Sequence, residues 1–217
     1  MIDLDGVSIA YGDTPILRDI SLRIAPGEKV VIIGQSGAGK TTLLRQIFDA
    51  QPERAAFVHQ DYALVPQLSV FHNICAGRLD FHGSLYNILN LLRPRPQEVA
   101  AVEPLVERLG MPDKLFERVG NLSGGQQQRV AVARAIYRQA DLVLCDEPVS
   151  AIDPLQAGTV LDLLAKADHT VVLAMHDVDL ALDHFERIVG LRLGRLEFDL
   201  HRDEVNDNLL RALYRPC

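Results

Sequence analysis

Short runs of consecutive apolar residues are the most regular pattern in the chain. Three of them, Lys29–Ile33, Leu142–Cys145 and Val171–Met175, are each followed by a loop and then by a helical pattern. Short continuous apolar runs are typical of parallel strands that are buried on both faces. The alternation of such strands with helices predicts an α/β fold, in which helices cover both sides of a wound parallel sheet.

The amino-terminal residues follow a second pattern, in which apolar and polar positions alternate. Apolar side chains occupy Ile20, Leu22 and Ile24, and a similar spacing runs from Ile2 to Ile9. Alternation with a period of two residues indicates strands with one buried face. We therefore expect a small antiparallel sheet near the amino terminus.

The middle of the chain, between Gln60 and Leu122, changes to helical patterns, prolines and turns without a strong strand signal. This change predicts a mostly helical subdomain at about residues 61–121. The 217 residues would then form a single domain, whose core is made of about 1–60 and 122–217. The other expected elements are helices over residues 41–48, 97–109, 124–138, 155–167, 177–185 and 207–214, and strands over 187–191 and 196–200.

A phosphate-binding loop follows the first buried strand. Residues 34–41 read Gly-Gln-Ser-Gly-Ala-Gly-Lys-Thr and fit G-x-x-x-x-G-K-[ST], between a buried strand and a helix. The glycines allow successive backbone N–H groups to surround a β-phosphate at the helix N-terminus. Lys40 is expected to bridge the β- and γ-phosphates, and Thr41 to offer its hydroxyl to Mg²⁺. The sequence therefore predicts binding and hydrolysis of ATP with Mg²⁺, and the predicted nucleotide-binding positions here are Gly34, Gln35, Ser36, Gly37, Ala38, Gly39, Lys40, Thr41 and Thr42.

Two acidic residues end the second buried strand. Asp146 and Glu147 directly follow Leu142–Cys145, and open α/β sheets gather their ligands at the carboxyl ends of their strands. Asp146 can supply the hard oxygen ligand that Mg²⁺ needs. Glu147 faces a different direction and can act as general base for an attacking water. Without a phosphate loop in the same chain, a solvated turn before Pro148 would be the better interpretation.

A second anion site is predicted where Leu122-Ser-Gly-Gly-Gln126 opens a helix, because two glycines free backbone amides at a helix N-terminus. One chain with one phosphate loop has no evident need for it, unless it completes the site of a neighbouring copy. At these residues the sequence resembles the nucleotide-binding subunit of an ABC transporter, whose signature Leu-Ser-Gly-Gly-Gln it matches residue for residue. The resemblance covers nearly the whole chain and adds as nucleotide-binding positions Ser123, Gly124, Gly125 and Gln126.

The resemblance also assigns roles to residues that would mean little alone. Tyr11 resembles the aromatic residue that stacks on adenine. Gln60 resembles the glutamine that reaches Mg²⁺ and the attacking water, and links to the membrane partner. Ser150–Asp153 resembles the loop that crosses to the opposite subunit, with Ile152 where leucine is commoner. His176 resembles the switch histidine that contacts the γ-phosphate and orients the water.

The family implies a particular assembly and location. Two copies would face head to tail and enclose two ATP molecules between the phosphate loop of one copy and residues 122–126 of the other. Closure would require ATP and would move transmembrane permease subunits, with an extracytoplasmic solute-binding protein as an indirect partner. The implied location is the cytoplasmic face of the cell membrane. Consistent with this, the start Met1–Asp5 lacks the basic and long apolar stretches of a secretory signal.

Several segments are similar to phosphonate-import ATPases within this family. They are residues 73–79, 122–134, 176–182 and 209–214. These segments concern helix packing and partner contacts and do not report substrate chemistry. Phosphonate or a related phosphorus oxyanion is therefore the expected cargo, and a polar amino acid or another polar solute is the alternative.

The chain departs from the family pattern between Lys40 and Gln60. Only 20 positions separate these residues, where the family usually places extra antiparallel strands and a connector. We therefore expect a small antiparallel subdomain and an altered groove for the coupling helix of the permease.

Composition and charge bear on the remaining alternatives. A net charge of −7 and a pI near 5.5 provide no basic stripe, so nucleic acid is not an expected partner. An ABC-type ATPase that remodels nucleic acid or another macromolecule is the main alternative, but the long coiled-coil insertions usual in that class are missing. The second alternative is a regulatory module that has lost catalysis. It is disfavoured because the chain keeps Lys40, Asp146, Glu147 and His176. The three cysteines are uneven in spacing and are expected to be reduced thiols.

Overall fold

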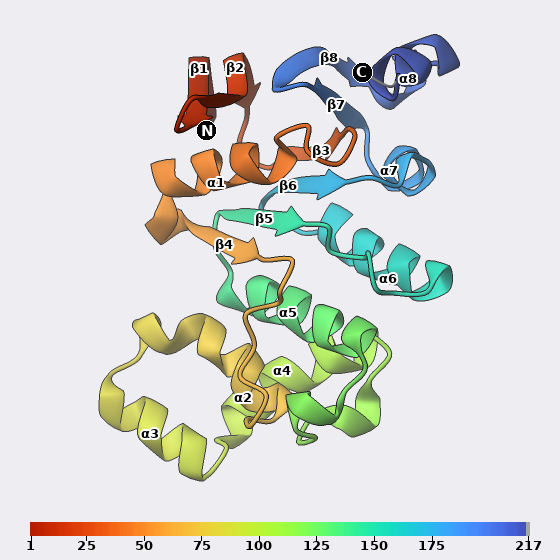
Figure 1. The fold of residues 1–217 in the computed structure, drawn as a ribbon. Helices are drawn as coiled ribbons and strands as arrows, with labels where there is room; N and C mark the ends of the chain where they lie inside the picture. Colours follow the sequence, from red (N-terminus) through yellow and green to blue (C-terminus); the bar gives the residue numbers. More distant parts are fainter. Residues whose placement is uncertain (216–217) are drawn as a thin grey trace. The chain divides into compact units, whose positions relative to one another are not determined.

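The computed structural model describes residues 1–215, which form two compact units. The sheet unit contains Met1–Phe57, Asp141–Glu147 and the chain from Leu164 onward, and the helical unit contains Val58–Ala140 and Pro148–Leu163. Figure 1 shows the succession of strands and helices along the chain. Because strands and helices are both present and the large sheet is mostly parallel, the predicted α/β class is confirmed.

The large sheet has the strand order β4-β5-β6-β3-β7-β8. Strand β3 lies between β6 and β7 and is parallel to both, β5 is parallel to β6, and β8 pairs with β7 in the antiparallel sense. The strand bounds are β3 Lys29–Ile33, β4 Ala55–Val58, β5 Leu142–Asp146, β6 Thr170–Met175, β7 Arg187–Arg192 and β8 Arg195–His201. All the strands predicted from apolar runs are therefore present. The short strand β4 was not predicted, because four residues carry too little periodicity.

Strand β3 is buried on both faces, which explains its uninterrupted apolar sequence. Val30 and Ile32 point into a core cluster shared with β5, β6 and β7, and the residues between and after them, Val31 and Ile33, are equally buried. A charged or polar side chain on either face would lose its hydration without a partner. The apolar run is therefore a requirement of the central position of β3 in the sheet.

Helix α1, Lys40–Ala50, packs on β5 and β6 and continues the same core. It begins after Gly39, which adopts a left-handed conformation with φ 104°. Its apolar face, made of Leu43, Leu44 and Ile47, is fully buried, and this spacing is the one expected of an amphipathic helix. Two further helices complete the sheet unit, α7 Val178–His184 and α8 Asp207–Leu213.

Strands β1, Ile2–Tyr11, and β2, Thr14–Ile24, form a separate two-stranded antiparallel sheet. The residues predicted to face inward, including Leu4, Ile20 and Leu22, are buried and belong to the core cluster of α1 and the large sheet. The predicted small antiparallel sheet is confirmed. Only one turn of 3-10 helix, Pro52–Arg54, separates α1 from β4, so no further strand is inserted there.

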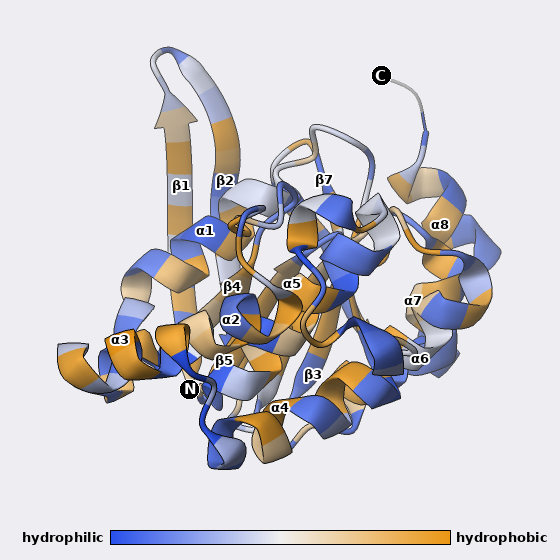
Figure 2. Cartoon of the chain, turned by 90° about the horizontal axis from the view of Figure 1, so that it is seen from below, coloured by the Kyte–Doolittle hydropathy of each residue, from blue (hydrophilic) through white to orange (hydrophobic). Residues whose placement is uncertain are grey.

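The helical unit contains five helices among the described residues: α2 Val70–Cys75, α3 Ser84–Leu92, α4 Pro96–Arg108, α5 Gly124–Arg138 and most of α6 Pro154–Ala165. Helix α2 packs against α4 and α5, with Phe71 and Ile74 fully buried between them. Helix α3 differs, because most of its apolar side chains are exposed, and it is strongly hydrophobic in Figure 2. The predicted helical bounds agree with the observed ones to within about two residues.

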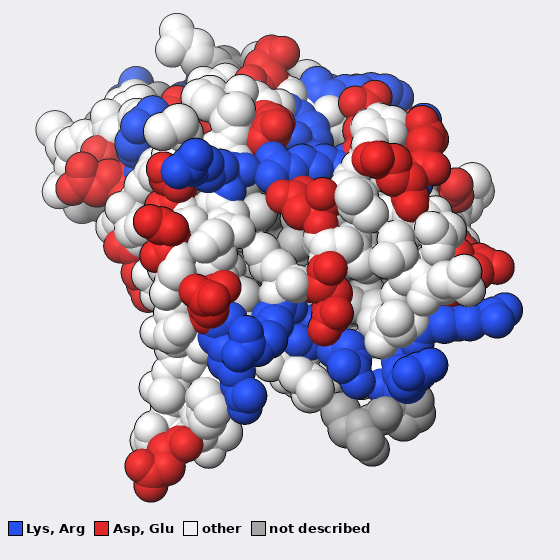
Figure 3. All heavy atoms as spheres, turned by 90° about the horizontal axis from the view of Figure 1, so that it is seen from above, with Lys and Arg blue, Asp and Glu red and all other residues white. Residues whose placement is uncertain are grey.

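Two surface properties complete the description. On the face shown in Figure 3, lysine and arginine side chains are interspersed with aspartate and glutamate. Among the described residues, no helix combines the length and the apolar character needed to span a bilayer.

The antiparallel edge of the large sheet provides a test of packing. Gly190 in β7 pairs with Phe198 in β8, and a Cβ atom added at Gly190 would lie 2.5 Å from the phenyl ring. Gly190→Ala is therefore expected to lower the free energy of unfolding by about 1–3 kcal/mol, measured by urea denaturation. The Phe198→Leu background should reduce this penalty, because the ring is removed. An equal penalty in both backgrounds would contradict the proposed contact.

Candidate active site

The loop after β3 is shaped by close approach of neighbouring backbone. A Cβ atom at Gly34 would lie 2.1 Å from the carbonyl oxygen of Leu191, and one at Gly39 would lie 2.8 Å from Leu17. Gly37 and Gly39 also adopt left-handed conformations, with φ of 78° and 104°. Side chains at these positions would require the loop to move. The glycines of the motif therefore allow the loop to sit against β2 and β7.

Lys40 is folded over this loop. Its side-chain Nζ donates hydrogen bonds to the carbonyl oxygens of Gly34, at 2.7 Å, and Gln35, at 3.2 Å. Burial lowers the pKa of the Lys40 ammonium, while the nearby carboxylates of Glu147 and Asp146 act in the opposite direction. The residue is only 7% exposed. The ammonium group of Lys40 is thus held beside the loop by hydrogen bonds that it could exchange for bonds to phosphate oxygens.

Thr41 and Asp146 are brought together at the start of α1. The Thr41 hydroxyl donates a hydrogen bond to the Asp146 carboxylate, which is 5% exposed. Burial raises the pKa of Asp146 and the charge of Glu147 adds to this effect, whereas the hydrogen bond from Thr41 is the largest opposing contribution. Two hard oxygen donors at one point fit the preference of Mg²⁺ for oxygen ligands.

A protein site made only of acidic and histidine ligands is not present in the described residues, where no group of three or more His, Cys, Asp or Glu side chains could hold a metal. Mg²⁺ usually binds proteins through one or two side chains and completes its coordination with water and substrate phosphates. The pair Thr41 and Asp146 therefore fits a magnesium ion that arrives with a nucleotide better than a resident metal centre.

The register of the parallel strands explains why Glu147 and His176 meet. Asp146 pairs with Ala174, and Ile33 pairs with Met175, so the residues that follow these strands leave the sheet side by side. The Glu147 N–H donates to Ala174 O at 2.9 Å. The carboxylate oxygen Oε1 of Glu147 lies 3.5 Å from His176 Nδ1, and the histidine side chain is 61% exposed. A partly exposed carboxylate and an exposed imidazole thus face each other beyond the ends of these strands.

Tyr11 ends strand β1 at the tip of the two-stranded sheet. The residue is 60% exposed, so its ring retains a free surface on which a planar base could stack. The sheet itself is anchored to the loop, because Ile16 and Leu17 of β2 lie against Gly39.

The predicted second anion site opens helix α5 in the helical unit. Ser123 and Gln126 form a capping box, in which Gln126 N donates to Ser123 Oγ at 3.3 Å and Ser123 N donates to Gln126 Oε1 at 3.0 Å. A Cβ atom at Gly125 would lie 2.6 Å from Ala151 O. The signature and the loop of residues 150–153 are therefore in close contact within this unit.

Gln128 is a structural residue of this site that the sequence analysis missed. It is 1% exposed; its Oε1 accepts from Ala151 N at 3.0 Å, and its Nε2 donates to Ser150 Oγ at 3.3 Å. A buried amide of this kind is costly unless both of its ends are bonded. The only signal in the sequence was the run of three glutamines at residues 126–128, which does not show which of them is buried.

The structure brings five predicted site residues together in the sheet unit: Lys40, Thr41, Asp146, Glu147 and His176. Two other predictions belong to the helical unit. They are Gln60, which is exposed just after β4, and the residues Ser123, Gly124, Gly125 and Gln126.

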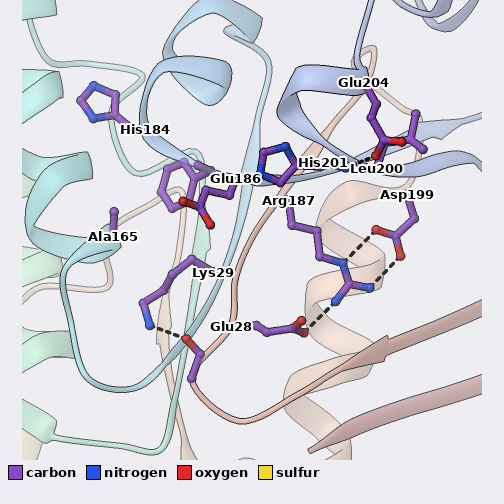
Figure 4. A pocket seen from close by; sticks show the side chains of 12 residues that line it. Glu28, Lys29, Ala165, His184, Glu186, Arg187, Asp199, Leu200, His201 and Glu204 are labelled. Carbon is purple, nitrogen blue, oxygen red and sulfur yellow. Dashed lines mark hydrogen bonds and ion pairs between the residues drawn. The ribbon is translucent and has the colours of Figure 1, made fainter.

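A cavity of about 630 Å³ lies at the opposite, amino-terminal edge of β3 and β7 (Figure 4). Arg187 crosses it and forms ion pairs with Glu28, at 2.7 Å, and with Asp199, at 2.7 Å. Lys29 donates from its Nζ to the carbonyl oxygens of Gly27 and His169. The bonds of Arg187 and Lys29 therefore link strands and loops at this edge of the sheet.

Comparison with known proteins places these features in context. The sequence matches the family described as ABC transporter over residues 17–55 and 48–150. The Phosphonates import ATP-binding protein PhnC 1 of Pseudomonas aeruginosa is 41% identical over 243 residues, covering 98% of this chain and 90% of that protein. The corresponding PhnC protein of Pseudomonas putida is 40% identical, with coverage of 98% and 89%.

Solved structures agree with the sequence comparison. A dimeric structure of MJ0796, a bacterial ABC transporter cassette, is similar with a TM-score of 0.80 at 27% identity, over 93% of this chain and 99% of that one. A structure of a post-hydrolysis state of the same cassette, bound to ADP and Pi, is similar with a TM-score of 0.78 at 25% identity and the same coverage.

The comparisons also locate the shortened segment. The alignment with the Pseudomonas aeruginosa relative spans 243 residues, more than the 217 of this chain, so the relative contains residues that are missing here. The family match divides at residues 48–55, which form the end of α1 and the turn before β4.

The raised pKa of Asp146 leads to a stability prediction. Folding disfavours its ionised form, so stability is lost as the pH rises through the raised pKa. Asp146→Asn should therefore raise the melting temperature at pH 7–8 without nucleotide or Mg²⁺, and the gain should shrink at acidic pH, where the wild-type carboxyl is protonated. In a chain of this size, each kcal/mol gained corresponds to about 2–4 °C.

The matched control for this measurement is Asp49→Asn, a change of the same charge at an exposed position of α1. Exposed substitutions of this kind usually change stability by less than about 0.5 kcal/mol. A lower melting temperature of Asp146→Asn at pH 8 would show that the carboxylate stabilises the nucleotide-free fold.

Proposed function

Because this chain belongs to the ABC transporter family and is an ABC-type ATPase, we propose that it is the ATP-binding subunit of an importer. It hydrolyses ATP to ADP and phosphate in a head-to-tail dimer and thereby drives uptake through membrane permease subunits. The observation that carries this proposal is the strand register that sets Lys40, Thr41, Asp146, Glu147 and His176 around one loop.

In this proposal the loop of residues 34–42 binds the phosphates through its backbone N–H groups and the N-terminus of α1. Lys40 exchanges its bonds to Gly34 and Gln35 for phosphate oxygens, since both of these acceptors are neutral carbonyls. Tyr11 stacks on the adenine, a contact typically worth about 1–3 kcal/mol. Thr41, Asp146 and Gln60 hold Mg²⁺, which neutralises charge on the phosphates when bound.

Hydrolysis requires a base and an oriented water. Glu147 accepts the proton of the attacking water, because its carboxylate directly follows the end of β5 and faces the imidazole of His176. His176 lies 3.5 Å from this carboxylate and contacts the γ-phosphate, so that it holds the water in line. Gln60 acts with them at the water and the metal.

Two copies are needed for a complete site. Within the predicted segment Ser123, Gly124, Gly125 and Gln126, the capping box engages the N–H groups of Ser123 and Gln126. The backbone amides of Gly124 and Gly125 are then the ones presented at the N-terminus of α5. These amides bind the nucleotide held by the phosphate loop of the second copy. The dimeric structure of a similar cassette supports this arrangement.

The proposed cargo is a phosphonate or a related phosphorus oxyanion, because the relatives with 40–41% identity carry the name of phosphonate import proteins. The chain would act at the cytoplasmic face of the membrane, bound to permease subunits. An extracytoplasmic solute-binding protein would deliver the cargo to them.

Helix α3 is the surface that we propose for the permease. Large apolar side chains are exposed along it and just before it: Leu79, Phe81, Leu85, Ile88, Leu89, Leu91 and Leu92. Leu85 and Leu92 are the most exposed of them, at 73% and 77%. Apolar patches of this kind are rare on monomers and mark sites of protein or membrane contact. A partner with an apolar cytoplasmic segment would remove this patch from water.

The catalytic assignment is tested by Glu147→Gln. Removing the base should lower ATP turnover by at least about 100-fold, while ATP still binds, because the loop and Lys40 are unchanged. Light scattering should then show a monomer without nucleotide and a stable dimer with ATP and Mg²⁺. Omitting Mg²⁺ or replacing Lys40 by Ala should abolish the shift. Unchanged turnover would mean that Glu147 is not the base.

The permease surface is tested by Leu85→Glu combined with Leu92→Glu. The charges should abolish co-purification with hydrophobic permease subunits, whereas ATP turnover of the isolated chain should stay within about twofold of wild type. Leu155→Glu, at a leucine of α6 that is 81% exposed, serves as the control and should still co-purify. Normal co-purification of the double variant would exclude α3 as the contact, and consistent purification with RNA or DNA alone would contradict the importer function.

A further inference from the structure

The hydroxyl of Tyr214 lies between two backbone segments of the candidate active site. It donates a long hydrogen bond of 3.5 Å to the carbonyl oxygen of His176, and it lies near the backbone of Gly34, at the start of the phosphate loop. The next residue adds a contact, because Gln35 Nε2 lies 3.5 Å from Arg215 O. The last turn of the described chain therefore touches both the loop and the segment that carries the histidine.

Helix α8 holds Tyr214 in this place. Its N-terminus is capped by Asn206, whose Oδ1 accepts from the N–H groups of Asn208 and Leu209. At the other end Leu213 is 1% exposed, and the helix packs against β7. Burial raises the pKa of the Tyr214 hydroxyl and the charge of Asp177 adds to the effect, so the hydroxyl stays protonated and remains a donor at neutral pH.

The two backbone segments that Tyr214 joins differ in how firmly they are held. Gly34 is packed so closely on β7 that a Cβ atom would lie 2.1 Å from Leu191 O. His176 lies beyond the end of β6, with its side chain 61% exposed. Loss of the Tyr214 hydroxyl would therefore leave Gly34 in place and release mainly the segment of His176.

We infer that Tyr214 is a positioning residue for hydrolysis, which fixes the backbone of His176 relative to the phosphate loop. The inference rests on the proposed function, in which His176 orients the water at the γ-phosphate. Tyr214 itself touches neither ATP nor water in this scheme. Because the hydrogen bond to His176 is long, its contribution is expected to be modest, about a threefold to tenfold effect on turnover.

The experiment is a double-mutant cycle with Tyr214→Phe, His176→Ala and the combined variant, using steady-state ATP hydrolysis by the full chain. Tyr214→Phe should lower kcat about threefold to tenfold and leave KM for ATP within about twofold, since ATP binding uses other groups. In the His176→Ala background the same change should have less than a twofold effect, because the group that Tyr214 positions is already gone.

Each other outcome has a separate meaning. An equal loss in both backgrounds, or no loss in either, would overturn the role of Tyr214. A normal kcat for His176→Ala would overturn the proposed role of the histidine itself and with it the inference. Tyr86→Phe removes a hydroxyl that donates to Glu98 in the helical unit and should leave kcat and KM unchanged. Thermal unfolding of all variants separates a loss of positioning from a loss of folded protein.

Discussion

The parallel register of β3, β5 and β6 is the constraint on which the candidate active site depends. The residues at the carboxyl ends of these strands lie at the same edge of the sheet. Strand β3 leads into the phosphate loop, β5 ends in Asp146, and β6 ends just before His176. A shift of one residue in any strand would turn its side chains to the other face. Such a shift in β5 would also move Asp146 out of line with Ala174 of β6, and so displace the acidic pair relative to the segment of His176.

The same edge carries two buried charged groups, and the burial of each has a cost in free energy. Lys40 and Asp146 are almost inaccessible, and burial disfavours the charged form of each. The opposite charges of Lys40 and Asp146 offset part of this cost for each other. The loop carbonyl oxygen that accepts from Lys40 and the Thr41 hydroxyl next to Asp146 offset a further part. A polyanion with a divalent cation would bring charges opposite to those of Lys40 and Asp146, which favours the binding of both.

The segment between α1 and β4 is one turn of 3-10 helix, and the phosphate loop is supported by other elements. The two-stranded sheet keeps its place because β2 contacts Gly39 and contributes to the common core. Strand pairing beyond β1 and β2 is absent from the described residues of that sheet. The phosphate loop is therefore supported by β2 and β7 directly, through backbone contacts that only glycine permits.

Much of the site could be predicted from the sequence, because its chemistry depends on residues that are close in the chain. The phosphate loop, the acidic pair and the helix signature each lie within about ten residues. The local spacing of apolar residues also predicted the strand before the phosphate loop and the helix after it. The strands themselves followed from apolar runs that only a doubly buried position requires.

The tertiary structure decided the contacts between residues far apart in the chain. The pairing of Glu147 with His176 depends on strand register, the bonds of Gln128 to residues 150 and 151 depend on helix packing, and Tyr214 reaches Gly34 across 180 residues. Periodicity reports which face of an element is buried, but it does not report which other element covers that face. Those contacts arise only when the strands assemble into one sheet and when the elements within each unit pack against one another.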